Sequence, residues 1–160
     1  MIRGLTDMWI ELAEKKEYED SSKLSGLRIS FDKRIDNGRK EEIKKFAKWL
    51  RKHYYFPIRC NIYVRYCSYF KKMDDSDVDS IGDFYYSDNK LPIIWIAGYP
   101  RRKTKDKDFY VQINASIVYF LTFYYQWFFC EFDKRSDRSL KIEATKWQNY
   151  IMDEYLDDLE

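Results

Sequence analysis

Hydrophobic and polar residues alternate with period two in two stretches of the chain, as expected of strands with one covered face. LRISF, residues 27–31, alternates over its whole length. In residues 56–70 one face would carry Ile58, Cys60, Ile62, Val64 and Tyr66. The opposite face would carry Arg59, Asn61, Tyr63 and Arg65. Residues 82–87 (GDFYYS) and 91–100 (LPIIWIAGYP) predict two further short strands. Because PIIWIA is almost continuously apolar, we expect this last strand to be covered on both faces.

Three other stretches have apolar residues at helical spacing. Residues 5–19 predict a short helix, whose apolar side would be Trp9, Ile10, Leu12 and Ala13. Residues 38–55 predict a lysine-rich helix with an apolar stripe formed by Ile43, Phe46, Ala47 and Leu50. Asp36, Asn37 and Gly38 before it offer a turn and an N-cap. Residues 138–157 predict a last amphipathic helix, buried along Leu140, Ala144, Trp147, Ile151 and Tyr155.

The segment from residue 109 to residue 130 has no charged side chain, although 35% of the whole chain is charged. Its length would suffice for a membrane span. Polar residues are nevertheless spread through it, at Gln112, Asn114, Ser116, Thr122 and Gln126. Aromatic residues, which are abundant here, usually mark the interfaces of a span rather than its middle. We therefore expect residues 109–131 to form a core helix, which is also apolar on all sides.

The predicted order is strand, helix, three strands, apolar helix and amphipathic helix. It indicates an α+β fold, in which a small mixed sheet of about four strands packs against the two last helices. At 160 residues the chain has the size of one domain. We assign residues 27–160 to this domain and residues 1–26 to an N-terminal helical arm.

Composition and charge narrow the class of protein. The formal net charge of +2 gives no strong attraction to nucleic acid or anionic lipid. The three cysteines lack metal-type spacing, and the charged N-terminus does not resemble a signal peptide. These features predict a cytoplasmic protein with reduced thiols, no membrane association and no cofactor.

The element order, with an apolar helix after the last strand and an acidic helix behind it, resembles the minimal metallopeptidase domain of the zincins. In these families the active helix carries H-E-x-x-H, often followed by aromatic residues and Gln-Trp. Residues 119–127, YFLTFYYQW, are similar to such a helix, with Tyr119 and Phe123 in place of the two histidines and Phe120 in place of the glutamate. Residues 143–147, EATKW, are similar to the gluzincin segment whose glutamate is the third zinc ligand. The resemblance implies vestigial zinc-site positions at Tyr119, Phe120, Phe123 and Glu143.

Residue chemistry excludes zinc-dependent peptide hydrolysis by this route. The motif works because two histidines at i and i+4 bind one metal ion while the glutamate polarises a bound water. This chain has a single histidine, His53. Phe120 cannot accept a proton, and Phe123 has no lone pair for a metal. If the resemblance holds, Glu143 points toward Tyr119, and we expect the Tyr119 hydroxyl, Lys146 or another nearby donor to satisfy its carboxylate.

The leading functional hypothesis is a non-catalytic, pseudo-metallopeptidase domain that binds a peptide or protein. In active zincins the strand beside the active helix pairs with extended substrate. By resemblance, a peptide-binding edge is expected at Ile93, Ile94, Trp95 and Ile96.

Two alternatives come from other classes. One is an enzyme of unrecognised chemistry that uses Glu143 in an aromatic pocket. The other is a nucleic-acid accessory protein that uses two basic patches. The first patch covers residues 39–52, and the second consists of Arg101, Arg102, Lys103, Lys105 and Lys107.

Overall fold

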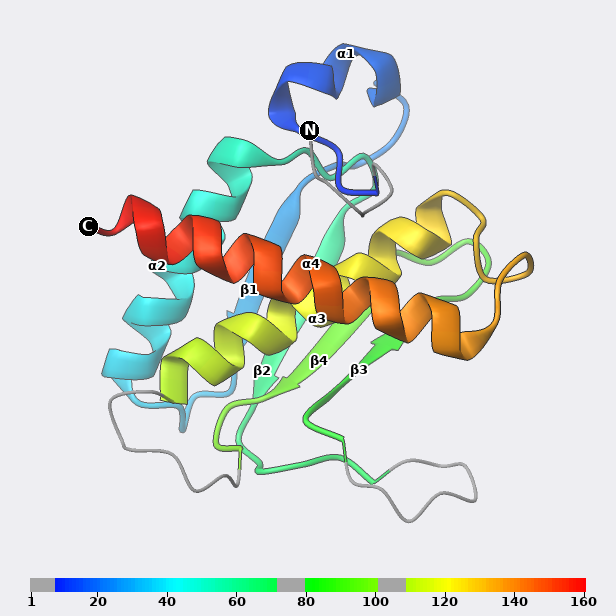
Figure 1. The fold of residues 1–160 in the computed structure, drawn as a ribbon. Coiled ribbons are helices and arrows are strands. Elements are labelled where there is room, and N and C mark those ends of the chain that lie inside the picture. The colour runs from blue at the N-terminus through cyan, green and yellow to red at the C-terminus, as the bar shows by residue number, and fades with distance from the viewer. Residues whose placement is uncertain (1–7, 72–79, 101–108) are drawn as a thin grey trace.

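The α+β fold is confirmed by the computed structural model of the protein, which describes residues 8–71, 80–100 and 109–160 (Figure 1). Its centre is a mixed sheet with the strand order β1-β2-β4-β3. The strands are β1 (Leu27–Phe31), β2 (Cys60–Arg65), β3 (Gly82–Tyr85) and β4 (Ile93–Ala97). β1, β2 and β4 are parallel to one another, and β3 pairs antiparallel with β4 at one edge.

The helices form a layer on the sheet. The longer ones are α2 (Asn37–His53), α3 (Phe109–Phe128) and α4 (Asp137–Asp158). α2 connects the parallel strands β1 and β2, α3 packs against β3 and β4, and α4 packs on α3. In Figure 1, α3 and α4 cross the sheet on the side that faces the viewer.

The two faces of the sheet differ in what covers them. Cys60, Ile62 and Val64 of β2 are fully buried against the helices, as are Ile94 and Ile96 of β4. The alternate side chains of the same strands point the other way: Tyr63 and Arg65 of β2 are exposed, whereas Ile93 and Trp95 of β4 are half-buried. The expectation that β4 is covered on both faces is therefore wrong, because α2 and α3 pack on one face only.

The N-terminal segment is part of the core. The predicted helix over residues 5–19 is wrong for Met8, Trp9 and Ile10, which are buried but not helical, and residues 5–7 lie outside the described residues. Helical structure begins later, with the 3₁₀ turn η1 (Leu12–Glu14) and the single-turn α1 (Lys15–Tyr18). The Trp9 indole lies 5.0 Å from the Tyr125 ring and 6.0 Å from the Trp147 ring, which fixes this segment against α3 and α4.

Local capping explains where α2 begins. Asp36 is its N-cap, as predicted, and its carboxylate accepts a hydrogen bond from the Arg39 backbone N–H at 2.8 Å. The Tyr99 hydroxyl donates to the same carboxylate at 2.9 Å, and the Arg39 guanidinium donates to the Gly98 carbonyl at 3.1 Å. These bonds attach the start of α2 to the segment that follows β4.

The uncharged segment forms α3, and its interpretation as a buried helix is confirmed. Ile117, Leu121 and Tyr124 are fully buried, and so are the polar side chains of Asn114 and Gln126. Among the described residues, no helix has both the length and the hydropathy that crossing a membrane requires.

Candidate functional site

An aromatic-walled hollow lies between α3 and the edge strand β3. Tyr119, Phe120 and Phe123 come from one side of α3, with ring centroids 5.0 to 5.8 Å apart. They line a cavity of about 490 Å³, which we call the β3 hollow. Its other lining residues are Ser80, Gly82, Asp83, Phe84, Tyr86, Phe132, Asp133, Asp137, Leu140 and Lys141. Three of the four positions singled out in the sequence are therefore brought together in space.

Gly82 allows the helix to approach β3 this closely. A Cβ atom at position 82 would lie 2.5 Å from Cε2 of Phe120 and 2.8 Å from the Trp95 carbonyl oxygen. No side chain fits at such distances without moving the ring or the neighbouring strand. The missing side chain at position 82 thus lets the Phe120 ring pack directly on the edge strand.

The hollow has an apolar wall and a polar rim of mixed charge. Phe120 is buried, whereas Tyr119 and Phe123 are half-buried and present part of their rings to the cavity. Burial raises the pKa of the Tyr119 hydroxyl, so this group is a neutral hydrogen-bonding group at physiological pH. Asp133, Asp137 and Lys141 are exposed at the rim. This arrangement suits an apolar side chain with polar groups around it.

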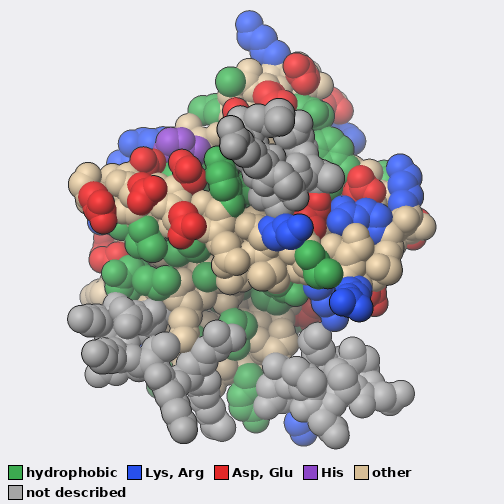
Figure 2. Space-filling view, viewed as in Figure 1, with side chains coloured by type: hydrophobic (Ala, Val, Ile, Leu, Met, Phe, Trp, Pro, Cys, Tyr) green, Lys and Arg blue, Asp and Glu red, His purple; other side chains and the backbone are tan. Residues whose placement is uncertain are grey.

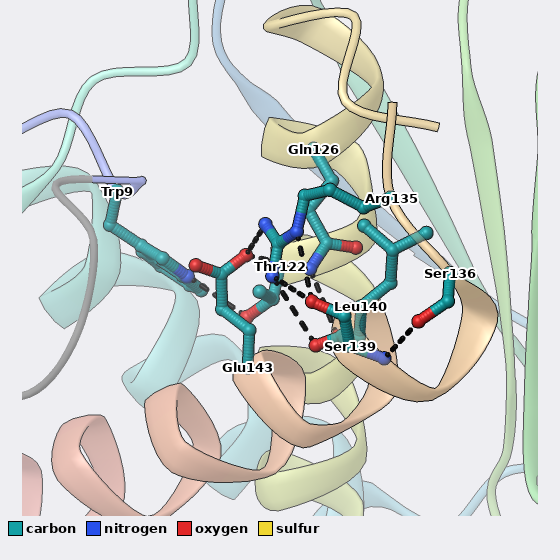
Figure 3. A network of polar contacts seen from close by, with 8 residues as sticks. All are labelled: Trp9, Thr122, Gln126, Arg135, Ser136, Ser139, Leu140 and Glu143. Carbon is teal, nitrogen blue, oxygen red and sulfur yellow. Dashed lines mark hydrogen bonds and ion pairs between the residues drawn. The ribbon is translucent and has the colours of Figure 1, made fainter. Parts of the chain in front are cut away.

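Glu143 belongs to a different environment, a polar network between α3 and α4 (Figure 3). Its side chain is buried, and its Oε1 accepts hydrogen bonds from Arg135 Nη1 at 2.7 Å and from Gln126 Nε2 at 2.9 Å. Arg135 also donates to the Ser139 hydroxyl, which anchors the connection before α4.

The carboxylate is therefore satisfied, as expected, although by Arg135 and Gln126 rather than by Tyr119 or Lys146. Sequence reasoning missed Arg135, because this residue lies in the hydrophilic α3–α4 connection, far from the helical pattern that singled out Glu143. Glu143 is not among the residues that line the β3 hollow.

The peptide-binding edge expected at Ile93, Ile94, Trp95 and Ile96 is wrong. These residues belong to β4, which pairs with β2 on one side and with β3 on the other, so neither side of the strand is free. The strand that lies at the sheet edge beside α3 is β3. The error arose because sequence order makes 91–100 the last strand, whereas the chain inserts it between two earlier ones.

Side chains of the protein itself occupy part of the β3 edge. The Ser80 hydroxyl donates to the Gly82 carbonyl at 2.6 Å and accepts from the Gly82 N–H at 3.3 Å. The Asp83 carboxylate accepts from the Phe84 N–H at 2.9 Å. A strand that pairs with β3 must replace at least the Ser80 contacts.

The basic patch of residues 39–52 lies beside acidic groups. Four of its lysines, Lys44, Lys45, Lys48 and Lys52, are exposed on α2. The Trp49 indole of the same helix donates to Asp158 Oδ2 at 2.7 Å. His53 Nε2 lies 3.7 Å from the same carboxylate oxygen. Figure 2 shows acidic side chains gathered over this end of α4. The second patch, Arg101, Arg102, Lys103, Lys105 and Lys107, lies outside the described residues.

No metal-binding cluster accompanies the hollow. Across residues 8–71, 80–100 and 109–160 there is no group of three or more His, Cys, Asp or Glu side chains that could hold a metal ion. Of the three cysteine thiols, Cys60 is buried, Cys67 is half-buried and Cys130 is exposed. Burial raises the pKa of the Cys60 thiol, so this group stays protonated.

The uncovered face of the sheet is a second surface, which sequence reasoning did not identify. We call it the open sheet face and define it by the outward residues of the four strands: Arg28, Ser30, Asn61, Tyr63, Arg65, Asp83, Tyr85, Ile93 and Trp95. The alternation in residues 56–70 had already placed Tyr63 and Arg65 on one face. The surface was missed because β4 was expected to be covered on both sides.

Neither a scan against models of protein families nor searches of curated proteins and of solved structures returned a match for this chain. Its function is therefore inferred from the chemistry of these two surfaces.

Proposed function

We propose that this protein is a non-catalytic, zincin-like domain that binds an extended peptide or protein segment along β3 and in the β3 hollow. One observation carries the proposal. The three positions at which the resemblance would require catalytic groups, Tyr119, Phe120 and Phe123, hold aromatic rings that together line a cavity beside an antiparallel edge strand.

Strand addition is the binding mode that suits this geometry. An extended segment can hydrogen-bond to the outer edge of β3 while alternate side chains reach the rings of α3. Tyr119 and Phe123 offer apolar contact, because they are only half-buried in the free protein. Asp133, Asp137 and Lys141 at the rim can bind polar groups that flank the inserted side chain.

Ser80 makes this binding competitive. Its hydroxyl already satisfies the N–H and the carbonyl of Gly82, so an incoming strand gains these hydrogen bonds only by displacing Ser80. The net gain from exchanging one hydrogen bond for another is small. Most of the affinity is then expected from the apolar side chain in the hollow.

The position of Glu143 argues against the alternative enzyme. A general acid or base must reach its substrate within hydrogen-bond distance or through one water. Glu143 is buried between Gln126 and Arg135 and does not line the hollow. Tyr119, the ionisable α3 group in the hollow, has a raised pKa and stays protonated near neutral pH.

The proposal is tested by selecting peptides from a random dodecapeptide library displayed on phage, with the full chain as target. We expect the selected peptides to carry large apolar residues at alternate positions. In fluorescence polarisation, Phe123→Glu should weaken their binding at least tenfold, because it places a charge in the hollow. Ser80→Ala should tighten binding severalfold, because it frees the main-chain groups of Gly82.

The matched control is Ile142→Glu, which introduces the same charge at a position of α4 that is exposed and does not line the hollow. Circular dichroism checks that each variant keeps its fold. A library that yields no enriched peptide, or peptides that bind equally well to Phe123→Glu, would show that β3 and its hollow are not a peptide site.

A further inference from the structure

The open sheet face carries aromatic rings and arginines in adjacent rows across the strands. Tyr63 of β2 is the register partner of Trp95 in β4, and Trp95 is the partner of Asp83 in β3. The Trp95 ring lies 5.3 Å from Tyr85 and 6.0 Å from Phe70. Tyr63 is 38% exposed and Tyr85 is 46% exposed. A flat group can therefore reach rings from neighbouring strands.

Guanidinium groups lie over and beside these rings. The Arg65 guanidinium stacks on the Trp95 ring at 4.8 Å, and Arg28 is exposed at the far strand of the same face. Among the described residues, no carboxylate lies within salt-bridge distance of Arg65 or Arg28. Two carboxylates lie nearby. Asp32 pairs with Arg34, and its pKa is lowered mainly by Arg34 and in smaller part by Arg65. Asp83 belongs to the face itself and accepts from the Phe84 N–H. The face therefore presents two guanidinium groups that form no ion pair with a described acid, beside the single carboxylate of Asp83.

We propose that the open sheet face is a second binding site, which takes single-stranded nucleic acid by stacking bases on Tyr63, on Tyr85 and on the Arg65 guanidinium that lies over Trp95, and by holding phosphates with Arg65 and Arg28. Every base has a flat π-face, so stacking on aromatic side chains accepts any sequence. Arginine adds both a planar group that stacks and a charge that attracts phosphate. The chemistry of the ligand thus matches both components of the face.

A protein partner fits this face less well. The centres of protein interfaces are depleted in charged residues, whereas here a guanidinium covers the central ring. Burying Arg65 under a protein would require a partner carboxylate in a fixed position. A mobile polyanion satisfies the same charge without such a requirement.

This site is separate from the proposed peptide site. The β3 hollow uses Gly82 and Phe84, which face α3, whereas the open sheet face uses Tyr85 and the side of Trp95 that points away from the helices. Asp83 borders both surfaces and is therefore left unchanged in all variants. Variants of one site should leave binding at the other unchanged. Failure of either proposal can then be recognised by itself.

The experiment uses the full chain and fluorescein-labelled 15-mers of uridine and of thymidine, measured by fluorescence anisotropy in 50 mM and 200 mM KCl. We expect binding to both, weakened several-fold or more by the higher salt concentration because phosphate contacts release counterions. Trp95→Ala should weaken binding at least tenfold, and Tyr63→Ala about threefold or more. Arg65→Lys should also weaken binding, because lysine keeps the charge and loses the planar stack.

Tryptophan fluorescence reports base binding directly, because its emission would not respond to oligonucleotide if Trp95 only stabilised the fold. Stacking of a base should quench the emission of the intact chain, and this quenching should be largely absent from Trp95→Phe. Lys48→Ala on α2 is the control, since Lys48 is exposed on the helix layer. Phe123→Glu, which disables the hollow, should bind the oligonucleotides like the original chain.

Three results would overturn the proposal. The first is no binding at 50 mM KCl. The second is binding that Lys48→Ala weakens as much as Trp95→Ala and Tyr63→Ala do, which would indicate general attraction to basic groups. The third is a dimer in sedimentation velocity that Trp95→Ala dissociates, which would make the face an interface between copies of this chain. If Trp95→Ala does not fold, Tyr63→Ala and Arg65→Ala replace it in the binding test. Both side chains are exposed, so their removal should leave the fold intact.

Discussion

The covered and open faces of the sheet are built from alternate residues of the same strands, yet they follow different rules. In β4, Ile94 and Ile96 are fully buried under the helices, while the alternate residues Ile93 and Trp95 remain partly exposed. On the covered face size and shape decide which residue fits. On the open face the rings and guanidinium groups stay in contact with solvent, which is typical of binding surfaces. The comparison suggests that stability and binding reside on opposite sides of one layer.

The largest change in the free energy of unfolding is expected from a comparison of two adjacent isoleucines, one on each face. Ile94→Ala should lower the free energy of unfolding by about 2–5 kcal/mol, because it leaves a cavity in the covered face. Ile93→Ala removes the same atoms from the open face and should cost about 1 kcal/mol or less. Urea denaturation followed by circular dichroism measures both. Equal losses for the two variants would mean that the open face is also covered.

A second test concerns how α4 is held on the helix layer. Arg135→Ala removes a donor from the buried Glu143 carboxylate and should destabilise the protein by about 2–3 kcal/mol, below the range for fully buried pairs because Arg135 is partly exposed. Adding Glu143→Gln to this variant removes the charge and should restore part of the loss. A double variant that is less stable than Arg135→Ala would show that Arg135 does not act through the Glu143 charge.

A third test concerns the buried tyrosines of the helix layer and measures how stability depends on pH. Burial raises the pKa of Tyr155 to about 12 and holds the pKa of Tyr124 and Tyr125 well above their usual value of 10. In the unfolded chain these hydroxyls ionise near pH 10, so the unfolded state releases protons first. Stability should be fully present below pH 10 and fall above it, by roughly 1.4 kcal/mol per pH unit for each such tyrosine.

Absorbance at 295 nm monitors this ionisation, and urea midpoints between pH 9 and pH 11.5 monitor stability. Tyr155→Phe cannot ionise and should make the alkaline fall less steep. A fall of unchanged steepness in this variant would mean that Tyr155 has an ordinary pKa in the folded state.

The smallest effect is expected at the end of α3. The Cys130 N–H bonds to the Trp127 carbonyl and the Glu131 N–H to the Gln126 carbonyl, a termination that favours glycine at position 130. Cys130 has a φ of 59°, in the left-handed region, and its side chain is exposed. Cys130→Gly should raise the free energy of unfolding by about 0.5–1 kcal/mol. Cys130→Ala keeps the strain and should change stability little; equal stabilisation by both variants would argue against backbone strain.

Local sequence patterns predicted where helices and strands lie along the chain. They did not predict which elements contact one another in space. The bounds of β1 and the buried stripes of α2 and α4 follow from periodicity, because one helix or strand buries one side. The position of β4 inside the sheet does not, since pairing order depends on the three-dimensional path of the chain. Met8–Ile10 was misassigned for a related reason: its non-helical form is stabilised by contacts of Trp9 with α3 and α4, which local spacing cannot reveal.

The candidate sites were predictable in part. Helical spacing by itself places Tyr119, Phe120 and Phe123 on one side of α3, as observed. The cavity beside them depends on Gly82, whose role appears only when β3 and α3 are placed in contact. The open sheet face required knowledge of which strand face the helices leave uncovered. Both sites therefore depend on tertiary packing that no single segment encodes.

The hydrogen bond from the Trp9 indole to the Thr122 hydroxyl, 3.0 Å long, joins residues 113 positions apart and has a consequence for synthesis on the ribosome. At about 5–20 residues per second, Thr122 is made roughly 6–23 s after Trp9. During this interval Met8, Trp9 and Ile10 have no core to enter, since their partners on α3 and α4 do not yet exist. Residues made 113 positions later thus complete the burial of this segment, so this part of the core forms only after α3 and α4 have been synthesised.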